Sequence, residues 1–294
     1  MSGPGRSTLT RLESFGRVLY PADAPAPILA GATRQLVIEW LREIESREAL
    51  AAARLEPRRK AMLFGPPGCG KTTLAHHLCG RLGMPLLLVE AANLLNAYKH
   101  DSARNVAAAF EEASRARAAV FLDEFDSLAT RREDSGRSVD QDNAHTVNTL
   151  LRRLDAFAWP VIAATNRREV IDPAVWRRFD LHLDIDLPGA DERWAIVKMY
   201  ADPFLVPASA HDFLADALLG APPSLIRQTV ESLKRALVLA PRMAGGLGTA
   251  GATLAGIVGS IVPPDMYEVD LWLGRARPDD MPGEGWPWPM EGGA

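Results

Sequence analysis

The segment Gly65–Thr73, which reads GPPGCGKTT, constrains the fold of this 294-residue chain more than any other. It matches the pattern G-x-x-x-x-G-K-[ST] and directly follows the apolar run AMLF, which predicts a buried strand. Glycines at these positions let backbone N–H groups turn inward around phosphate oxygens, and a helix that begins at Lys71 directs its positive end at the same point. We name Gly65–Thr73 the phosphate loop, and we expect it to bind a nucleoside triphosphate.

The side chains of the phosphate loop have separate expected roles. The Lys71 ammonium is expected to contact the β- and γ-phosphates, and the Thr72 hydroxyl is expected to bind Mg²⁺. Cys69 takes a position that usually holds threonine or a small residue, and we interpret it as a tolerated variant. The other expected nucleotide contacts come from Gly65, Pro66, Pro67, Gly68, Gly70 and Thr73.

A second apolar run, AAVFLDEFDS, ends in two adjacent acidic residues, Asp123 and Glu124. Because the carboxyl ends of parallel strands meet at one edge of a sheet, we expect this acidic pair beside the phosphate loop. Asp123 is expected to bind Mg²⁺ through water, and Glu124 to act as the general base that polarises the attacking water. Two adjacent carboxylates repel each other, which favours a cation at this edge.

The run IAATNR places Asn166 at the end of the next strand along the chain. An asparagine after a strand is usually a turn former. Its position one strand after the acidic pair instead favours a catalytic role, in which the amide holds the water between Glu124 and the γ-phosphate.

The distribution of apolar runs predicts the domain organisation. Five such runs alternate with helical patterns, which predicts an α/β fold of three layers, with a parallel sheet between helices. After Pro188 the strand patterns stop, and helical patterns follow, the last of them with an apolar stripe near 222–240. We expect a flexible N-terminal arm at 1–28, the α/β domain at 29–188, a small helical domain at 189–241 and a Gly/Pro-rich tail with a short helix at 242–294.

Net charge and cysteine content bear on the expected partner and cellular compartment. The net charge of −4 gives no electrostatic reason to expect nucleic acid or an anionic membrane as the main partner. The two cysteines, Cys69 and Cys79, lack a paired spacing, and no signal-peptide pattern precedes them. These features predict a protein of the reducing cytoplasm without disulfides or structural zinc.

The C-terminal region raises two questions. The uncharged stretch Met243–Val262 is rich in Gly, Ala and Thr rather than Leu, Ile and Phe, so we do not expect it to span a membrane. The ending GWPWPM interleaves Trp and Pro. Such a segment is either a polyproline-type ligand for a partner or a tail that folds back onto its own domain.

In their order and spacing, these segments resemble the AAA clade of the AAA+ superfamily of P-loop ATPases. The resemblance runs from about Leu29 to Ala240 and is carried by GPPGCGKTT, VFLDEFDSLATRR, VIAATNR and DPAVWRRFD, followed by the helical region. It implies strand order 5-1-4-3-2, a small all-helical lid, and ATP held between the large domain and the lid. It also implies Mg²⁺-dependent hydrolysis of ATP to ADP and phosphate by a homo-oligomer, usually a hexameric ring.

The resemblance assigns a role to the segment VWRRFDLHLDIDLP. In the family, an arginine immediately before Phe reaches into the site of the neighbouring subunit, and Arg178 matches that position, with Arg177 expected to assist. Such an arginine finger is worth about 10³–10⁵ in turnover, because it neutralises charge that develops on the transferred phosphoryl group. The chain lacks the Pro-Gly of the commoner form RPGRFD, so the resemblance leaves open which of the two arginines is the finger.

The segment AYKHDSARN resembles the loop that faces the central pore in AAA proteins. Tyr98 would be the aromatic residue that grips a threaded polypeptide, whereas Lys99 and His100 replace the aliphatic residue and glycine of the family pattern. Arg131 and Arg132 would belong to a second, polar pore loop. Without the resemblance, Tyr98 would be interpreted as an ordinary residue of a surface turn.

Together these features predict an ATP-driven machine that unfolds, remodels or disassembles a protein substrate, recruited directly or through an adaptor. Two alternatives stay open at this point. One is a nucleic-acid-associated AAA+ ATPase, such as a loader or a transposition regulator, whose ATPase rate would rise with DNA and fall steeply with salt. The other is a nucleotide switch that regulates a partner such as a protease.

Overall fold

The computed structural model describes residues 6–91, 102–129, 139–242, 246–261, 277 and 280–291. The chain divides into two compact units. The first, which we call the large unit, comprises Met1–Pro27, Gly31–Gly65 and Gly70–Ile185. The second, which we call the helical unit, comprises Ile28–Ala30, Pro66–Cys69 and Asp186–Ala294.

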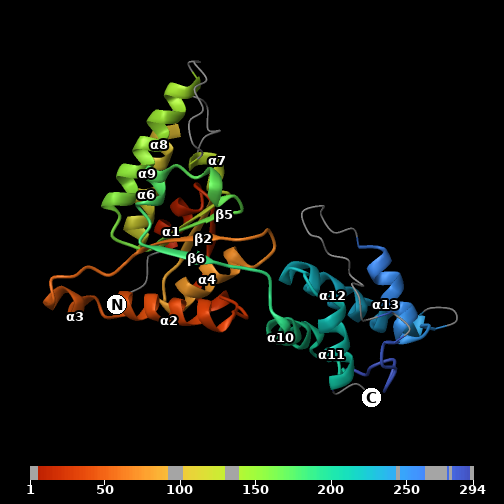
Figure 1. Cartoon of the computed structure of the whole chain (residues 1–294). Coiled ribbons are helices and arrows are strands. Elements are labelled where there is room, and N and C mark those ends of the chain that lie inside the picture. Colours follow the sequence, from red (N-terminus) through yellow and green to blue (C-terminus); the bar gives the residue numbers. More distant parts are fainter. Residues whose placement is uncertain are drawn as a thin grey trace. The chain divides into compact units, whose positions relative to one another are not determined.

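The large unit contains a six-stranded sheet made of β1 (Arg17–Leu19), β2 (Lys60–Phe64), β3 (Leu86–Glu90), β4 (Ala119–Asp123), β5 (Val161–Thr165) and β6 (Leu181–Asp184). The strands lie in the order β1-β3-β4-β5-β2-β6 (Figure 1). β1 pairs antiparallel with β3, and the other five strands run parallel to one another. Without β1, the strands numbered along the chain have the order 5-1-4-3-2, which confirms the expected α/β fold.

Helices cover both faces of the sheet (Figure 1). The helices described in the large unit are α1 (Arg6–Leu12), α2 (Gly31–Glu45), α3 (Arg47–Ala52), α4 (Lys71–Arg81), α6 (Ser102–Ala116), α7 (Asp126–Ala129), α8 (Val139–Ala156) and α9 (Pro173–Trp176). On one face α1, α6 and α8 bury Leu12, Phe110 and Leu154 in a common apolar cluster with β4. α2 and α4 lie on the other face. Because both faces are covered, the parallel strands are almost continuously apolar.

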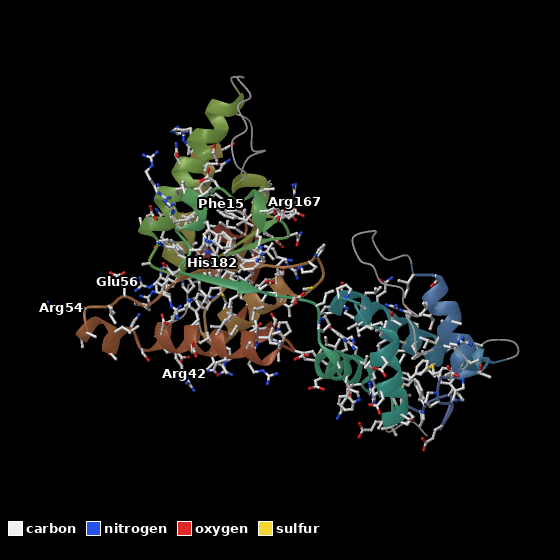
Figure 2. All side chains as sticks on the ribbon, viewed as in Figure 1. Phe15, Arg42, Arg54, Glu56, Arg167 and His182 are labelled. Atoms are coloured by element: carbon white, nitrogen blue, oxygen red, sulfur yellow. The ribbon has the colours of Figure 1, made fainter. Side chains whose placement is uncertain are left out.

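The described part of the predicted N-terminal arm, residues 6–28, contains the helix α1 and the strand β1. α1 packs against α6, and β1 extends the sheet at its edge. Leu12 is fully buried and Val18 is 8 % exposed. Phe15 points toward the interior, whereas Arg42, Arg54 and Glu56 project outward (Figure 2). β1 is fixed by β3, a partner that is distant in sequence, so local Gly/Pro content carries no signal for this strand.

The segment after β1 lies across α4. It includes the 3-10 turn η1 (Pro21–Asp23), which contacts α4. His76 on α4 hydrogen-bonds the Tyr20 carbonyl through Nε2 at 2.8 Å. A Cβ on Gly80 would lie 2.4 Å from Ala24 Cβ, so glycine permits this close approach. The helix that follows the phosphate loop is therefore held by the N-terminal segment.

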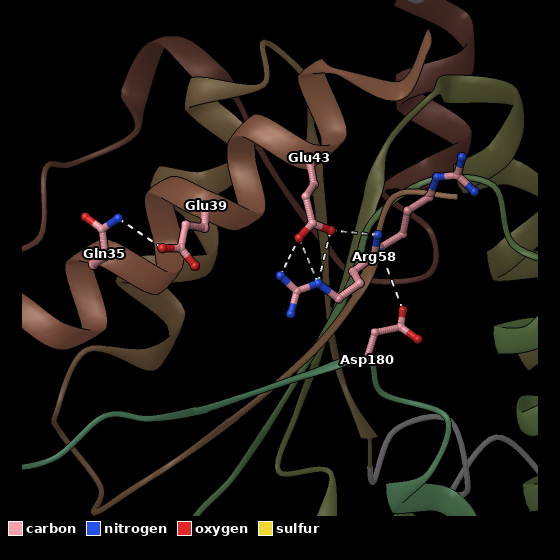
Figure 3. A network of polar contacts seen from close by, with 6 residues as sticks. Gln35, Glu39, Glu43, Arg58 and Asp180 are labelled. Carbon is pink, nitrogen blue, oxygen red and sulfur yellow. Dashed lines mark hydrogen bonds and ion pairs between the residues drawn. The ribbon is translucent and has the colours of Figure 1, made fainter. Parts of the chain in front are cut away.

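Two acidic side chains fix the starts of β2 and β6 (Figure 3). Arg58, just before β2, donates through Nε to both carboxylate oxygens of Glu43 on α2, at 3.0 Å each. The hydrogen bond with Arg58 lowers the pKa of the Glu43 carboxyl. Asp180, just before β6, accepts from the backbone N–H groups of Arg59 and Lys60, at 3.3 Å each. The Glu43–Arg58 pair is partly exposed and contributes about 1 kcal/mol or less, so its main effect is to fix α2 against β2.

The helical unit contains α10 (Ala190–Ala201), α11 (Ala208–Ala217), α12 (Pro223–Leu239) and α13 (Ala250–Gly259), with a 3-10 turn, η3 (Ala240–Arg242). The apolar stripe of α12 is buried in one cluster with residues of α10, α11 and α13. None of the helices that the structure describes is long and apolar enough to cross a membrane.

The C-terminal residues 280–291 pack onto the helical unit. Trp288 is 2 % exposed in its apolar cluster, and it meets Trp286 edge to face with 5.0 Å between ring centroids. Trp286 Nε1 donates to the Gly248 carbonyl at 2.9 Å. Backbone hydrogen bonds of 2.9 and 2.8 Å also join residues 289–291 to residues 203–205. Of the two interpretations of GWPWPM, the structure therefore supports the tail that folds back onto its own domain.

We predict that Trp288→Ala destabilises the helical unit by about 3–5 kcal/mol, because it removes a buried indole from an apolar cluster. Met290→Ala is the matched control, since Met290 lies in the same segment but is 44 % exposed. It should change stability by about 0.5 kcal/mol or less. Urea unfolding followed by circular dichroism measures both, and equal unfolding midpoints for Trp288→Ala and wild type would contradict the burial of this side chain.

Candidate active site

Three neighbouring strands of the large unit end together at one edge of the sheet. β5 lies between β4 and β2, and both pairs of strands are parallel. Asn166 follows β5, Gly65 follows β2, and Asp123 ends β4. The sheet thus places Asn166 between the phosphate loop and the acidic pair, as the strand order requires.

The phosphate loop depends on glycine at several positions. Gly65, Gly68 and Gly70 have φ angles of +147°, +75° and +90°, which residues with a Cβ rarely adopt. At Gly65 a Cβ would also lie 2.1 Å from the carbonyl oxygen of Ile185, which follows β6. Gly70 directly precedes α4, so its conformation sets the direction in which the positive end of this helix faces the loop.

The remaining loop residues differ in exposure. Thr73 is half-buried on the first turn of α4. The segment Pro66–Cys69 belongs to the helical unit; its two prolines are half-buried and Cys69 is buried. The interpretation of Cys69 as a tolerated variant stays a prediction from the sequence.

Lys71 joins the phosphate loop to the end of β5. Its side chain is 8 % exposed, and its Nζ donates to the Gly65 carbonyl at 2.8 Å and to Asn166 Oδ1 at 2.6 Å. A buried ammonium needs such acceptors, because its loss of water is costly. The two bonds hold the charge at the mouth of the loop and fix the orientation of the Asn166 amide.

Thr72 and Asp123 form an oxygen pair suited to Mg²⁺. The Thr72 hydroxyl donates to Asp123 Oδ2 at 3.3 Å, which brings the first turn of α4 to the end of β4. Mg²⁺ prefers oxygen ligands and retains several waters, so a hydroxyl and one carboxylate meet its usual demand on a nucleotide-binding protein. The residues present therefore fit the expected ion.

Glu124 has an unusual backbone conformation. Its φ is +50°, in a region that residues other than glycine rarely adopt. Its N–H bonds Asp123 Oδ1 at 3.0 Å, and the next residue, Phe125, is fully buried and donates from its backbone to the Ala164 carbonyl at 2.8 Å. The anchored neighbours keep Glu124 in this turn with its side chain exposed at the sheet edge. Strain of this kind is typical of functional sites.

A hydrogen bond between Thr165 and Asp126 forms a second polar connection at this edge, which the sequence does not predict. The Thr165 hydroxyl, 1 % exposed at the end of β5, donates to Asp126 Oδ1 at 2.9 Å. The same hydroxyl oxygen accepts from the N–H of Arg167 at 3.0 Å. The connection fixes the chain on both sides of Asn166 and joins it to the turn that carries Glu124. Thr165 and Asp126 are visible in the runs IAATNR and DEFDS, but nothing in the sequence pairs them.

The arginine pair, Arg177 and Arg178, follows α9. Arg178 donates through Nε to Asp155 Oδ2 at 3.2 Å and through Nη1 to the Ala174 carbonyl at 2.6 Å. The side chain of Arg177 is exposed. In the structure Arg178 is bonded to Asp155 and Ala174 and Arg177 is exposed, a difference that the sequence does not predict.

Two groups of candidate residues lie outside the described part of the chain. Tyr98 and Lys99 fall in 92–101, and Arg131 and Arg132 fall in 130–138. Their assignment to pore loops stays a prediction from the sequence.

Residues 61–187 match the model of the ATPase family associated with various cellular activities (AAA). The matched region contains the phosphate loop, the acidic pair, Asn166 and the arginine pair. The chain carries an AAA domain. It is a P-loop ATPase domain of the AAA+ superfamily, as its sheet order also indicates.

Curated relatives match more than half of the chain. It is 39 % identical over 177 residues to the ATP-dependent zinc metalloprotease FtsH 1 of Symbiobacterium thermophilum, which covers 58 % of this chain and 29 % of that protein. It is 36 % identical over 165 residues to the uncharacterized AAA family ATPase y4kL of Sinorhizobium fredii, with 55 % and 49 % covered. It is 35 % identical over 174 residues to the proteasome-activating nucleotidase of Methanopyrus kandleri, with 57 % and 39 % covered. The chain spans less than half the length of each of these relatives.

Solved structures share the fold of the AAA domain. A crystal structure of the FIGL-1 AAA domain has a TM-score of 0.70 at 19 % identity and covers 89 % of this chain and 91 % of that chain. A structure of that domain in complex with ADP has a TM-score of 0.69 at 19 % identity and covers 92 % and 94 %. At this level of identity the similarity shows the fold alone.

We predict that Gly65→Ala weakens ATP binding by about ten-fold or more, or about 1.4 kcal/mol. The new Cβ would meet the Ile185 carbonyl and force the loop out of its conformation. Gly31→Ala is the control, because a Cβ at that position meets no atom within 4 Å. Titration with a fluorescent ATP analogue measures both affinities. Wild-type affinity in Gly65→Ala would show that the loop does not depend on this close approach.

Proposed function

We propose that this protein hydrolyses ATP with Mg²⁺ and uses the energy to unfold, remodel or disassemble a protein substrate. In this proposal it acts as a ring of identical subunits, a hexamer. The observation that carries the ATPase part is the set of contacts at the sheet edge. Lys71 bonds Asn166, Thr72 bonds Asp123, and Glu124 is exposed beside them. These groups supply phosphate binding, the Mg²⁺ ligands and the base that phosphoryl transfer to water requires from one subunit.

The proposed reaction divides the work among these side chains. The Lys71 ammonium contacts the β- and γ-phosphates and offsets their charge. Glu124 accepts a proton from water as the water oxygen bonds to the γ-phosphorus, and the bond from that phosphorus to the β,γ-bridging oxygen breaks. The products are ADP and phosphate. Thr72 and Asp123 would hold Mg²⁺, which supplies charge stabilisation at the phosphates.

Asn166 is proposed to orient the attacking water. Its Oδ1 accepts from Lys71, so its amide nitrogen is directed away from the ammonium. The nitrogen can then donate to the water or to a γ-phosphate oxygen. The connection from Thr165 to Asp126 supports this role, because it fixes the backbone on both sides of Asn166.

Protein remodelling is supported by the nature of the relatives. One of them is named an ATP-dependent zinc metalloprotease and another a proteasome-activating nucleotidase. The net charge of −4 argues against nucleic acid as the main partner. We therefore propose a protein substrate or adaptor as the partner, with Tyr98 gripping the substrate in the pore of the ring and one member of the arginine pair completing the neighbouring site.

We predict that Glu124→Gln lowers ATP turnover by about 10²–10⁴-fold, because the amide cannot accept the proton of the attacking water. ATP affinity should stay within about three-fold of wild type, since the phosphate loop is unchanged. Glu169→Gln is the matched control: this carboxylate belongs to the 3-10 turn η2 (Arg168–Val170) after β5 and is 66 % exposed. Phosphate release and nucleotide titration measure the two effects. Undiminished turnover in Glu124→Gln would reject the assigned base.

We predict that Tyr98→Ala keeps basal ATPase activity within about two-fold but abolishes substrate unfolding, because the ring no longer contacts a threaded chain. Tyr98→Phe should keep both activities, since it retains the aromatic ring. Unfolding is measured as ATP-dependent loss of fluorescence from green fluorescent protein that carries an unstructured tail. If Tyr98→Ala unfolds this probe as fast as wild type does, the pore role is wrong.

A further inference from the structure

The two members of the arginine pair have different surroundings. Arg178 is 32 % exposed and is held by the Asp155 carboxylate and the Ala174 carbonyl, through two separate nitrogens. Arg177 is exposed, and among the residues that the structure describes no hydrogen bond or ion pair to its guanidinium is recorded. Arg178 is therefore bonded within its own chain, whereas the side chain of Arg177 is exposed to solvent.

Arg178 bonds two acceptors of its own chain, the Ala174 carbonyl and the Asp155 carboxylate. α9 spans only Pro173–Trp176, so its last carbonyls have no partner within the helix. Arg178 caps one of them, at Ala174. Asp155, in the last turn of α8, faces both Arg178 and the Lys60 ammonium, at 3.2 and 4.0 Å. Turning Arg178 toward another subunit would remove its capping bond and one of the two cations that Asp155 faces.

The chain before Arg177 is anchored within the large unit. Asp172 caps the start of α9 by accepting from the Ala174 N–H at 2.6 Å. Val175 is buried. Trp176 stacks on His182 of β6, with ring centroids 4.0 Å apart and 14° between the planes.

The chain after Arg178 is anchored as well. Phe179 is 3 % exposed and meets Phe125 edge to face, with 5.5 Å between the ring centroids. Asp180 accepts from the backbone at the start of β2 (Figure 3). With both flanks fixed, Arg177 is a long cationic side chain on a rigid backbone, which suits a group that must reach a charged target at a set distance.

We propose that Arg177 is the residue that reaches the triphosphate of the adjacent subunit, and that Arg178, held by Asp155, is a positioning residue that fixes α9 beneath it. This inference rests on the proposed function, in which the site is completed by a neighbouring subunit. It reverses the expectation from the sequence, which placed the finger at the arginine next to Phe179.

Single variants separate the two roles. Arg177→Ala should lower kcat by about 10³-fold or more, with little change in the KM for ATP, because the lost charge acts on the transition state. Arg178→Ala and Asp155→Asn should each lower kcat by a smaller and similar factor, about 3- to 30-fold, since a displaced α9 misplaces Arg177. The double variant Arg178→Ala with Asp155→Asn should lower kcat no more than either of these single variants does, because both substitutions break the same ion pair.

A charge exchange gives the sharper test. Asp155→Arg combined with Arg178→Asp restores an ion pair between α8 and the end of α9. It should recover part of the kcat lost by Arg178→Ala, because it restores neither the donor to the Ala174 carbonyl nor the carboxylate that faces Lys60. If Arg178 itself contacted the phosphates, a carboxylate there would repel them and no recovery would occur. The matched control is the Arg153–Glu111 pair, which joins α8 to α6 at 2.9 Å with similar exposure. Arg153→Ala should leave kcat unchanged.

The proposal is overturned if Arg178→Ala is as severe as Arg177→Ala while Asp155→Asn has no effect, or if the losses of Arg178→Ala and Asp155→Asn add. A separate experiment, in which subunits with different variants are mixed, tests the proposed function itself. Glu124→Gln subunits supply intact arginines, and subunits that carry Arg177→Ala and Arg178→Ala together supply intact Glu124, so mixed assemblies should regain ATPase activity. Absence of recovery would reject a site shared between subunits, whichever arginine is the finger.

Discussion

Burial of the Lys71 ammonium is the constraint on which the active site depends. A charge that is 8 % exposed must find acceptors, and it finds them at the Gly65 carbonyl and the Asn166 amide. These acceptors follow β2 and β5, so the parallel register of the two strands must hold for the ammonium to be satisfied. The same sheet edge brings Asp123 to Thr72. One buried charge thus ties phosphate binding to the position of the proposed water-orienting group.

The turn at Glu124 shows how packing offsets strain. A residue held at positive φ costs of the order of 1–3 kcal/mol. Burial of a large apolar side chain contributes about 1.5–3 kcal/mol, and Phe125, the next residue, is fully buried. The ring of Phe125 also meets Phe179, which follows the arginine pair. The proposed base and the arginine pair of one subunit are therefore joined through a single aromatic contact.

Much of this site could be predicted from the sequence because its signals are local. A strand followed by a glycine-rich turn and a helix fixes the phosphate loop within a few residues, and acidic residues at a strand end can only lie at the sheet edge. The N-terminal segment could not be predicted in the same way. Its Gly/Pro content describes local flexibility, whereas β1 is fixed by pairing with β3, where Arg17 lies opposite Leu88. The packing of Trp288 likewise depends on helices distant in sequence.

The sequence by itself determined the phosphate loop, the acidic pair, the position of Asn166 and the alternation that makes a parallel sheet. These follow from backbone geometry over short stretches and from the period of apolar residues. Only the tertiary structure decided which acceptors satisfy Lys71, how Thr165 and Asp126 support Asn166, and how Arg177 differs from Arg178. Two adjacent arginines have almost the same local sequence. They are separated by Asp155, a carboxylate 23 residues earlier in the chain that reaches Arg178 only because α8 ends beside α9 in the folded domain.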